Sequence, residues 1–490
     1  MTLNVRKDYI PKVRRKVQTI DFFKTLDAYT PEERLNLHYG SYGYNFMLSG
    51  GVLQTGIGLD NASYKVEDER VVLPTLAVYG ERIKVLHYFR GLNTTSPERL
   101  IAFSNQGNFY SCSLLTQGEF TKIEGIKGEA GSQASFINYY YEGREIMLIL
   151  YSGGVATYDG EVVKVFENTP VLTSSIMLYD RLFGISEDTL YFSAPLNPTD
   201  FSVENGGGSI SFMDEGGALK KIIALGSDIY VFREFSIFKL SVIGSPSDYV
   251  LSRVGYFDQK FVPGTLQNVG NELYFMIGKC LYSFDGYLLK QIRRELTALI
   301  ESTDYATATY FDLTYYLSCR IKTDDSIVGD EGDMPPLYNN GIIYVSTLTP
   351  MHGVLRGADV ISFYPILTSK LKAIFVVYGN ARSHRPGMIV EGGTLYGTPL
   401  KKLWVSPKVI LGDEGEQTNL KRVYANVYDN VDITVTQEEK RVTRTVPKNS
   451  FEPVTFNTIG NDFRFEISTD GNLRIGKITF VFNLSRRCAR

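Results

Sequence analysis

The chain has 490 residues, more than a single hydrophobic core usually organises, so we expect one large domain and at least one smaller one. Its formal net charge is −3, so the overall charge does not indicate binding to nucleic acid or to an anionic membrane. Tyr (33), Phe (29) and Gly (45) are abundant, which favours many short strands joined by tight turns.

The sequence gives no sign of a zinc centre, a disulfide framework or a membrane span. Its four cysteines are widely separated and form no CxxC pair or Cys/His cluster, which favours reduced, structural thiols. They are Cys112, Cys280, Cys319 and Cys488. Apolar runs stay well below the ~18–20 residues of a membrane span, and the N-terminus lacks the apolar stretch of a signal peptide. We therefore expect a protein made in the cytosol that does not leave by the general secretory route.

Residues 1–70 differ from the rest of the chain, and we expect an N-terminal arm followed by an extended Gly-rich segment. Several Lys and Arg residues make the arm basic, which indicates either a solvated arm or an anion contact. The Thr30-Pro31-Glu32-Glu33 sequence predicts one short helix to about Leu37. Glycines interrupt residues 40–58, which suits positive φ angles or close backbone approaches, not a phosphate-binding loop.

From Val71 to about Val390 the chain repeats a strand–turn–strand unit. The clearest copies cover residues 182–192 and 229–240, where aromatic and β-branched residues flank polar turns. Further strands are expected at Ile83–Phe89, Leu100–Phe103, Ile146–Tyr151, Val155–Tyr158, Leu273–Ile277, Leu281–Phe284, Ala308–Ile321, Gly341–Ser346 and Ala373–Tyr378.

The aligned turns recur every ~34–47 residues, close to the ~40–45 residues of a four-stranded propeller blade. A small twisted sheet cannot bury both of its faces alone, whereas radially packed sheets cover one another and leave only short edges. The sequence therefore predicts an all-β fold, with a β-propeller of about six or seven blades over residues 71–395.

Two segments interrupt the repeat. Residues 323–334 are rich in Asp and Glu, but their spacing does not fit a helix-flanked calcium loop. We interpret them as a flexible acidic surface loop and leave calcium binding open. Residues 291–302 carry Ile292, Leu296 and Ile300 at helical spacing, which predicts a short helix packed on the propeller.

Residues 396–490 alternate apolar and polar residues, with Asn, Asp and Gly in the turns. This pattern predicts a C-terminal β-sandwich-like domain of about seven strands. Trp404, the only tryptophan, is either a core anchor, which we favour, or a contact at an interface. The sequence at residues 468–471, Ser-Thr-Asp-Gly, is similar to the start of an Asp-box but lacks its closing aromatic residue.

The residues do not form a recognisable catalytic set, so we expect neither an enzyme nor a bound cofactor or metal. The four histidines stand outside HExxH and hydrolase-type motifs. They are His38, His87, His352 and His384. Carboxylates are numerous enough for a glycosidase-type pair, but nothing in the sequence selects one.

Residues 181–240 resemble a known protein family. The sequence Leu190-Tyr191-Phe192-Ser193 precedes Asn197-Pro198-Thr199-Asp200-Phe201, three glycines at 206–208, and the strand pair SDIYVFREFSIFKL. This order is similar to that of the tail hub, nozzle or "stabilisation" proteins of double-stranded DNA bacteriophages. The segments NFMLSGGVLQTGIG and LWVSPKVILG also resemble this family, but the likeness is specific only in residues 181–240.

The resemblance implies a structural virion protein: a propeller with accessory β segments that forms a sixfold homo-oligomeric ring, a tail hub or nozzle, around the DNA channel. Such a protein would be synthesised in the host cytoplasm, would contact other tail and portal-proximal proteins, and would line or close the channel through which double-stranded DNA passes. A ring of this kind is a head-to-tail assembly that closes. Candidate assembly contacts are Arg14, Arg15, Tyr42, Tyr44, Asn45 and Trp404.

Two other classes of function are compatible with the sequence. The main alternative is a propeller that binds or cleaves glycans in host recognition, which requires a pocket of convergent carboxylates and aromatic residues. A cellular scaffold of repeat type fits the period but has no further motif in its favour.

Overall fold

The computed structural model describes residues 14–66, 69–74, 76, 80–91, 98–114, 118–141, 143–212, 217–322, 338–349, 351–367, 371–379, 384–411, 416–450 and 452–486. Across these residues the fold is all-β, and its only helices are short 3-10 helices. The chain divides into two compact units. The propeller unit comprises Leu59–Leu348 and Arg356–Ile389; the sandwich unit comprises Met1–Gly58, Thr349–Leu355 and Val390–Arg490.

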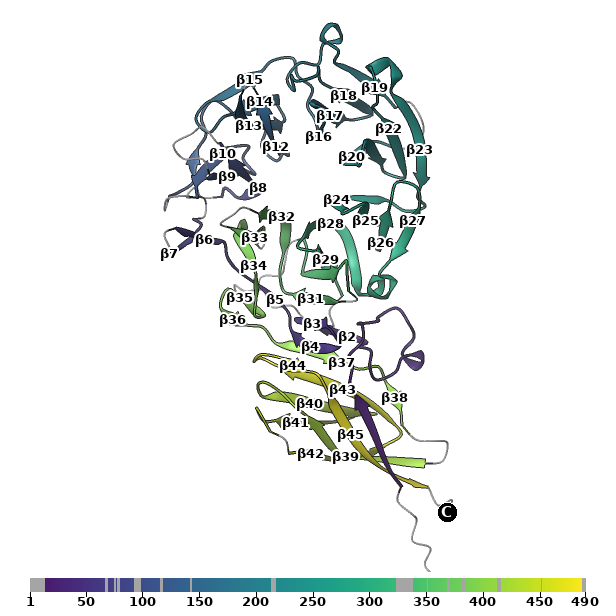
Figure 1. Ribbon diagram of the computed structural model, residues 1–490. Helices are drawn as coiled ribbons and strands as arrows, with labels where there is room; N and C mark the ends of the chain where they lie inside the picture. The colour runs from purple at the N-terminus through teal and green to yellow at the C-terminus, as the bar shows by residue number, and fades with distance from the viewer. Residues whose placement is uncertain are drawn as a thin grey trace, which may run out of the picture. The chain divides into compact units, whose positions relative to one another are not determined.

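Seven antiparallel sheets form the blades of the propeller unit in the described part of the chain (Figure 1). Blade 1 contains β8 (Ile83–Arg90), β9 (Glu98–Ser104), β10 (Phe109–Ser113) and β11 (Thr121–Lys122); blade 2 contains β12 (Ser135–Tyr141), β13 (Arg144–Tyr151), β14 (Gly154–Tyr158) and β15 (Val163–Phe166). Blade 3 contains β16 (Ser174–Leu178), β17 (Arg181–Ser186), β18 (Thr189–Phe192) and β19 (Gly208–Ser211).

The remaining blades follow the same antiparallel order. Blade 4 contains β20 (Leu219–Leu225), β21 (Asp228–Arg233), β22 (Ser236–Ser241) and β23 (Val250–Tyr256); blade 5 contains β24 (Phe261–Val269), β25 (Glu272–Ile277), β26 (Cys280–Phe284) and β27 (Leu289–Ile292). Blade 6 contains β28 (Ile300–Phe311), β29 (Thr314–Ile321) and β30 (Gly341–Ser346), and blade 7 contains β32 (Val360–Leu367), β33 (Lys372–Gly379), β34 (His384–Glu391) and β5 (Ile57–Asn61).

The blades close into a ring. The first strand of each blade contacts the first strand of the next, in the order β8, β12, β16, β20, β24, β28 and β32. β32 also contacts β8, so blade 7 packs against blade 1, as the ring in Figure 1 shows. The predicted propeller is therefore confirmed, and its seven blades agree with the expected six or seven.

Blade 7 obtains its fourth strand from a segment that precedes all the other blades in the chain. β5 lies beside β34, and the N–H of Ala62, just after β5, donates to the Pro386 carbonyl at 3.5 Å. The hairpin β6 (Ser63–Val66) and β7 (Glu69–Val72) then packs Tyr64 into a core shared with Leu86 of blade 1 and Phe375 of blade 7. The two ends of the repeat region are thus joined by non-covalent contacts at the closure.

Apolar packing between blades stabilises the ring. Between blades 4 and 5, Phe232 stacks on Phe261 with ring centroids 4.7 Å apart and meets Phe275 edge-on at 5.0 Å. All three rings are buried. Between blades 1 and 2, Phe109 meets Tyr151 edge-on at 5.8 Å. Aromatic pairs at such distances contribute ~0.5–1.5 kcal/mol beyond the burial of their surface.

The two predicted helices are only partly confirmed. Residues 30–37 contain only the 3-10 helix η1 (Glu32–Arg34), because the N–H of Thr30 donates to the Asp27 carboxylate at 2.8 Å in a local turn and no side chain caps the helix. Residues 291–302 contain the 3-10 helix η4 (Arg294–Leu299), which ends where β28 begins. Two further 3-10 helices are η2 (Val203–Asn205) and η3 (Pro246–Asp248). The acidic segment 323–334 lies outside the described residues.

The sandwich unit contains two main sheets. One contains β1 (Arg14–Ile20), β45 (Ile478–Arg486), β39 (Glu416–Ala425) and β42 (Val454–Gly460); the other contains β2 (Tyr42–Tyr44), β37 (Lys402–Val405), β43 (Asp462–Thr469), β40 (Val431–Gln437) and β41 (Lys440–Val446), with β38 (Val409–Ile410) beside β43. Phe465 and Phe480 pack across the two sheets with centroids 4.2 Å apart, and Phe463 and Phe482 at 5.8 Å. This arrangement confirms the predicted β-sandwich.

The N-terminal residues belong to this unit, in contrast to the expected segments 1–70, 71–395 and 396–490. β1 pairs along its whole length with β45, and the hydroxyls of Thr19 and Thr479 lie 3.3 Å apart. The Gly-rich segment 40–58 forms β2, β3 (Phe46–Ser49), β4 (Val52–Thr55) and the start of β5. As expected, glycine is required there: Gly51 has φ +80°, and a Cβ on Gly58 would lie 2.0 Å from the Thr394 carbonyl oxygen.

Smaller strands complete the sandwich unit. Along one edge, β3 pairs with both β31 (His352–Arg356) and β4, and β4 pairs with β44 (Arg474–Ile475). The strands β35 (Thr394–Leu395) and β36 (Thr398–Pro399) form a short hairpin. These pairings bring residues from near both ends of the chain into one unit.

We predict that Phe232→Ala destabilises the protein by about 3–5 kcal/mol, because it removes a ring that fills the space between two blades and leaves a cavity there. Denaturant unfolding would measure the loss. Tyr256→Ala is the control, since Tyr256 lies on the surface of the same blade and its removal should change the stability by no more than about 0.5 kcal/mol. Equal effects of the two substitutions would contradict the packing described here.

Candidate functional site

Trp404 is a core residue of the sandwich unit. Its side chain is fully buried and meets Phe23 edge-on at 5.3 Å. A Cβ on Gly40 would lie 2.7 Å from the indole Nε1, so this glycine leaves the space that the indole occupies. The role of core anchor accounts for Trp404, and its side chain presents no surface to another chain.

Tyr42, Tyr44 and Asn45 lie on β2 and just after it, in the same unit. Tyr44 and Asn45 are buried, and the Tyr42 and Tyr44 rings lie 6.0 Å apart. Asn45 has φ +60°, a conformation that Asn tolerates better than most residues. Its side-chain amide donates to the Lys401 carbonyl at 2.8 Å, so Asn45 contributes to the internal structure.

Arg14 and Arg15 lie at the surface, at the start of β1. Within the described residues β1 pairs only with β45 and is the edge strand of its sheet. Lys16 follows, and its ammonium donates to the Leu411 carbonyl at 2.9 Å. Basic side chains on an edge strand discourage indiscriminate strand pairing and leave an exposed cationic strip. Of the six candidate residues, these two arginines are the exposed ones.

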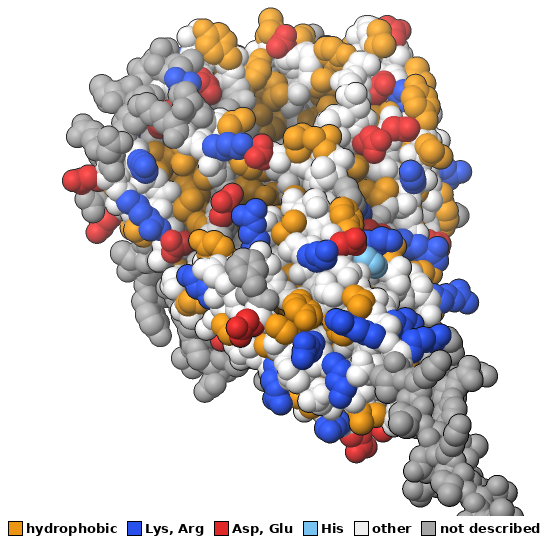
Figure 2. Space-filling model, turned by 60° about the horizontal axis from the view of Figure 1, so that its bottom comes forward, with side chains coloured by type: hydrophobic (Ala, Val, Ile, Leu, Met, Phe, Trp, Pro, Cys, Tyr) orange, Lys and Arg blue, Asp and Glu red, His pale blue; other side chains and the backbone are white. Residues whose placement is uncertain are grey.

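The nearly neutral chain is divided into two units of opposite charge. The sandwich unit has 23 Lys and Arg against 17 Asp and Glu, a formal charge of +6. The sequence of the propeller unit has 28 Lys and Arg against 37 Asp and Glu, a formal charge of −9, but within its described residues the numbers are 26 and 27. Lys and Arg side chains predominate over Asp and Glu in the lower half of Figure 2. The sequence alone did not reveal this asymmetry, because the positive unit is assembled from both ends of the chain.

Three of the histidines have structural partners. His352 Nε2 accepts a hydrogen bond from the Leu26 N–H at 2.9 Å, and His38 Nδ1 lies 2.9 Å from the Phe22 carbonyl. His87 lies 2.7 Å from the Asn138 side-chain oxygen and stacks on Phe136. In the described part of the chain, no group of three or more His, Cys, Asp and Glu side chains is placed to hold a metal ion.

The described cysteines are free thiols. Burial raises the pKa of Cys112 to about 11 and that of Cys319 to about 12. Both thiols therefore stay protonated at neutral pH, which makes them poor nucleophiles. In the same described part, no helix has the length and apolar character needed to traverse a bilayer.

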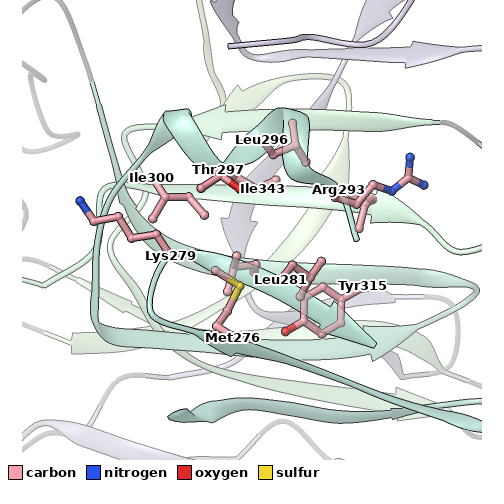
Figure 3. A pocket seen from close by; sticks show the side chains of 11 residues that line it. Met276, Lys279, Leu281, Arg293, Leu296, Thr297, Ile300, Tyr315 and Ile343 are labelled. Atoms are coloured by element: carbon pink, nitrogen blue, oxygen red, sulfur yellow. The ribbon is translucent and has the colours of Figure 1, made fainter. Parts of the chain in front are cut away.

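A small cavity lies between blades 5 and 6, beneath η4 (Figure 3). It measures about 20 Å³ and is lined mainly by apolar side chains, among them Met276, Leu281, Leu296 and Ile343. A space of this size admits about one water molecule, and its lining offers that water few hydrogen bonds. The cavity is a gap in the packing of two blades, not a ligand site.

A polar concavity of about 700 Å³ opens on the sandwich unit. Its lining includes Asp429, Asp432 and Asp470, the last of these from the Asp-box-like sequence at residues 468–471. Asp429 accepts from the Asn472 N–H at 2.9 Å, and Asp432 from the Thr445 hydroxyl at 2.6 Å. These carboxylates are thus held by neighbouring donors, and the concavity offers further hydrogen-bonding groups to a ligand.

Comparisons with known proteins provide a fold-level likeness and no family. No protein-family model matches the chain, and no curated protein matches it. One similar solved structure is BBS1N in complex with ARL6DN: its sequence identity is 9%, its TM-score is 0.44, and the match covers 67% of this chain and 96% of that chain. Another is the extracellular domain of BT4673 from B. thetaiotaomicron, with 8% identity, a TM-score of 0.44, and coverage of 90% of this chain and 62% of that chain. A third is Chaetomium thermophilum Raptor, with 9% identity, a TM-score of 0.43, and coverage of 68% of this chain and 29% of that chain. These TM-scores carry no functional argument, so the fold is assigned from the strand pairings.

One carboxylate of blade 1 is surrounded by hydrogen-bond donors. The Glu81 carboxylate accepts from the Ser104 hydroxyl, from the Asn108 amide at 2.9 Å and from the Tyr110 hydroxyl at 2.7 Å. Partial burial by itself raises the pKa of Glu81, but these three hydrogen bonds outweigh it and lower the pKa below its usual value. The charged form of Glu81 therefore contributes to folding stability.

We predict that Glu81→Gln lowers stability by about 1–3 kcal/mol at pH 7, because the charged acceptor is lost. The folded-state pKa of Glu81 is depressed, so its contribution is present above the unfolded-state pKa of about 4.3 and is lost as the pH falls through the lower, folded-state value. Thermal unfolding of both proteins from pH 7 to pH 3 should show their difference shrinking in acid. A difference that does not vary with pH would contradict this account.

Trp404 also offers a test of the sandwich core, because it is the only tryptophan. We predict that its fluorescence in the native protein resists quenching by acrylamide, since the indole is fully buried. Unfolding should make it fully quenchable. Phe232→Ala, which affects the propeller unit, should leave the native quenching unchanged. Native quenching as strong as that of unfolded protein would place the indole at the surface.

Proposed function

We propose that this protein is a structural component of a tailed bacteriophage virion, which forms a homo-oligomeric ring in the tail and lines or closes the DNA channel. The resemblance of residues 181–240 to tail hub and nozzle proteins supports the proposal. So does the closed propeller with an accessory β unit. The observation that carries it is that propeller, in which seven blades close into a ring and a separate β-sandwich unit is present.

A ring requires each subunit to present two different surfaces, one to each neighbour. Units of opposite charge on one chain provide such a pair, because the basic unit of one copy attracts the acidic unit of the next. The exposed Arg14 and Arg15 on β1 are the best placed of the candidate residues to take part. The small net charge of −3 also suits a channel wall, since DNA must pass without strong phosphate contacts.

An architectural role without catalysis is part of the proposal. Buried cysteine thiols with raised pKa values and histidines held by backbone groups support it. The location in the virion tail, the sixfold symmetry and the contacts with other tail proteins rest on the resemblance.

We predict that the purified protein forms discrete oligomers at low ionic strength and breaks into smaller species in 1 M NaCl, where the Debye length falls from ~10 Å at 0.1 M to ~3 Å. The double variant Arg14→Glu/Arg15→Glu should weaken assembly. Arg253→Glu, a charge reversal at an exposed arginine of the acidic unit, should not. Analytical ultracentrifugation and negative-stain images of the protein alone and with tail components would measure these effects. A protein that stays monomeric under all these conditions would exclude the proposed ring.

The polar concavity on the sandwich unit favours a second candidate function, the binding of glycans on a host surface. Exposed Tyr428 lies beside it, with the Lys448 ammonium 5.8 Å from its ring centroid. An aromatic ring beside amides, hydroxyls and carboxylates is an arrangement that binds sugars. A glycan array with the native protein and with Asp429→Ala/Asp432→Ala would decide this. If the native protein binds no glycan, or if the double variant still binds every glycan that the native protein binds, this candidate function is excluded.

A further inference from the structure

One face of the sheet formed by β1, β45, β39 and β42 is turned away from the sandwich core. Phe480 and Phe482 of β45 pack into that core, so the alternate residues Thr479, Val481 and Asn483 lie on the opposite face, which we call the outer sheet face. The strand register places further side chains beside them on β1, β39 and β42. These are Arg15, Val17, Thr19, Arg422, Thr455 and Ile459.

Three cations of the outer sheet face have no carboxylate partner among the residues that the structure describes. Two of them, Arg15 and Arg422, are exposed. The third, Lys421, lies in a β-bulge of β39, and its ammonium donates to the Asn457 side-chain oxygen of β42 at 3.0 Å. The described outward positions of the four strands carry no Asp or Glu. The outer sheet face is therefore locally cationic.

Several other cations of the sandwich unit are paired within the chain. On the other main sheet, Arg441 of β41 pairs with Glu466 of β43. Lys408, just before β38, pairs with Asp462 at 2.5 Å. A nearby carboxylate offsets the field of such a cation, whereas the three cations of the outer sheet face keep theirs. The face is thus defined by its own unpaired charges and not by the total charge of the unit.

The outer sheet face otherwise offers hydrogen-bonding groups and has no exposed apolar centre. Thr455, Thr479 and Asn483 contribute hydroxyl and amide groups, and Val481, on an interior strand, is only 5% exposed. The exposed apolar side chains of the face lie on its two outermost strands, β1 and β42. Tight protein–protein contacts are centred on buried aromatic or aliphatic residues, and binding to a bilayer requires apolar side chains that enter it. A polar face with unpaired cations instead suits a ligand that presents anionic oxygens.

We propose that the outer sheet face contacts the sugar–phosphate backbone of double-stranded DNA. Charge complementarity selects this partner, because Lys and Arg together with hydroxyl and amide side chains make most protein contacts to phosphate oxygens. Such contacts do not read the bases, so the face binds duplexes of any sequence. The contact rests on the proposed function, in which DNA passes the protein. Three cations displace few counterions, so binding is weak and sensitive to salt, which leaves the duplex free to move along the face.

Fluorescence anisotropy of a short labelled DNA duplex tests this contact with the full chain. With three phosphate contacts, the affinity of the native protein should fall about 40-fold between 50 and 200 mM NaCl. Lys421→Glu/Arg422→Glu should bind at least tenfold more weakly at 50 mM NaCl and show a much smaller dependence on salt. Lys401→Glu/Lys448→Glu, which changes the charge equally, is the matched control: both lysines line the polar concavity, and their change should leave binding unaltered. Native resistance of Trp404 to acrylamide shows that a variant is folded.

The outcomes separate this inference from the proposed function. Oligomers that form normally but bind no duplex, or duplex binding that the two double variants weaken equally, would overturn the contact and leave the ring intact. Binding to phosphatidylserine vesicles, or self-association, that Lys421→Glu/Arg422→Glu abolishes while duplex binding is absent or unchanged would assign the face to a membrane or to another copy, and would also overturn the contact. A protein that stays monomeric but binds the duplex through Lys421 and Arg422 would overturn the ring and support the contact.

Discussion

The constraint on which this structure depends is that a small antiparallel sheet has two apolar faces and cannot cover either of them alone. In the propeller unit each face is buried against the neighbouring blade, as the stack of Phe232 on Phe261 illustrates. The arrangement is complete only when the last blade meets the first, which the contact between β32 and β8 achieves. Each blade thus depends on both of its neighbours, and the ring is a cooperative structure.

The same constraint places the functional groups. The apolar faces of the strands are buried between the blades, so the groups that stay accessible on the propeller lie mainly in the connections between strands. Within the described residues, His352 is hydrogen-bonded internally and Cys319 is buried. Several large apolar side chains at the turns of the blades are exposed, among them Tyr179, Ile243 and Tyr287.

In the proposed ring, such surfaces would form the contacts between copies. Opposite formal charges on two units of one chain would favour contacts between unlike surfaces of successive copies. The charges would set the orientation, and the apolar side chains would stabilise the contact once it has formed.

The sequence by itself determined the strands, the propeller and the sandwich, because alternating side chains and turn residues are local signals. The strand at residues 341–346 was predicted to the residue. Tertiary structure alone decided that β1 joins β45 and that β5 completes blade 7, since no local pattern identifies a partner hundreds of residues away. It also placed Trp404, Tyr44 and Asn45 inside the sandwich unit and exposed Tyr287 and Ile410, because burial depends on which strands meet and not on the residue type.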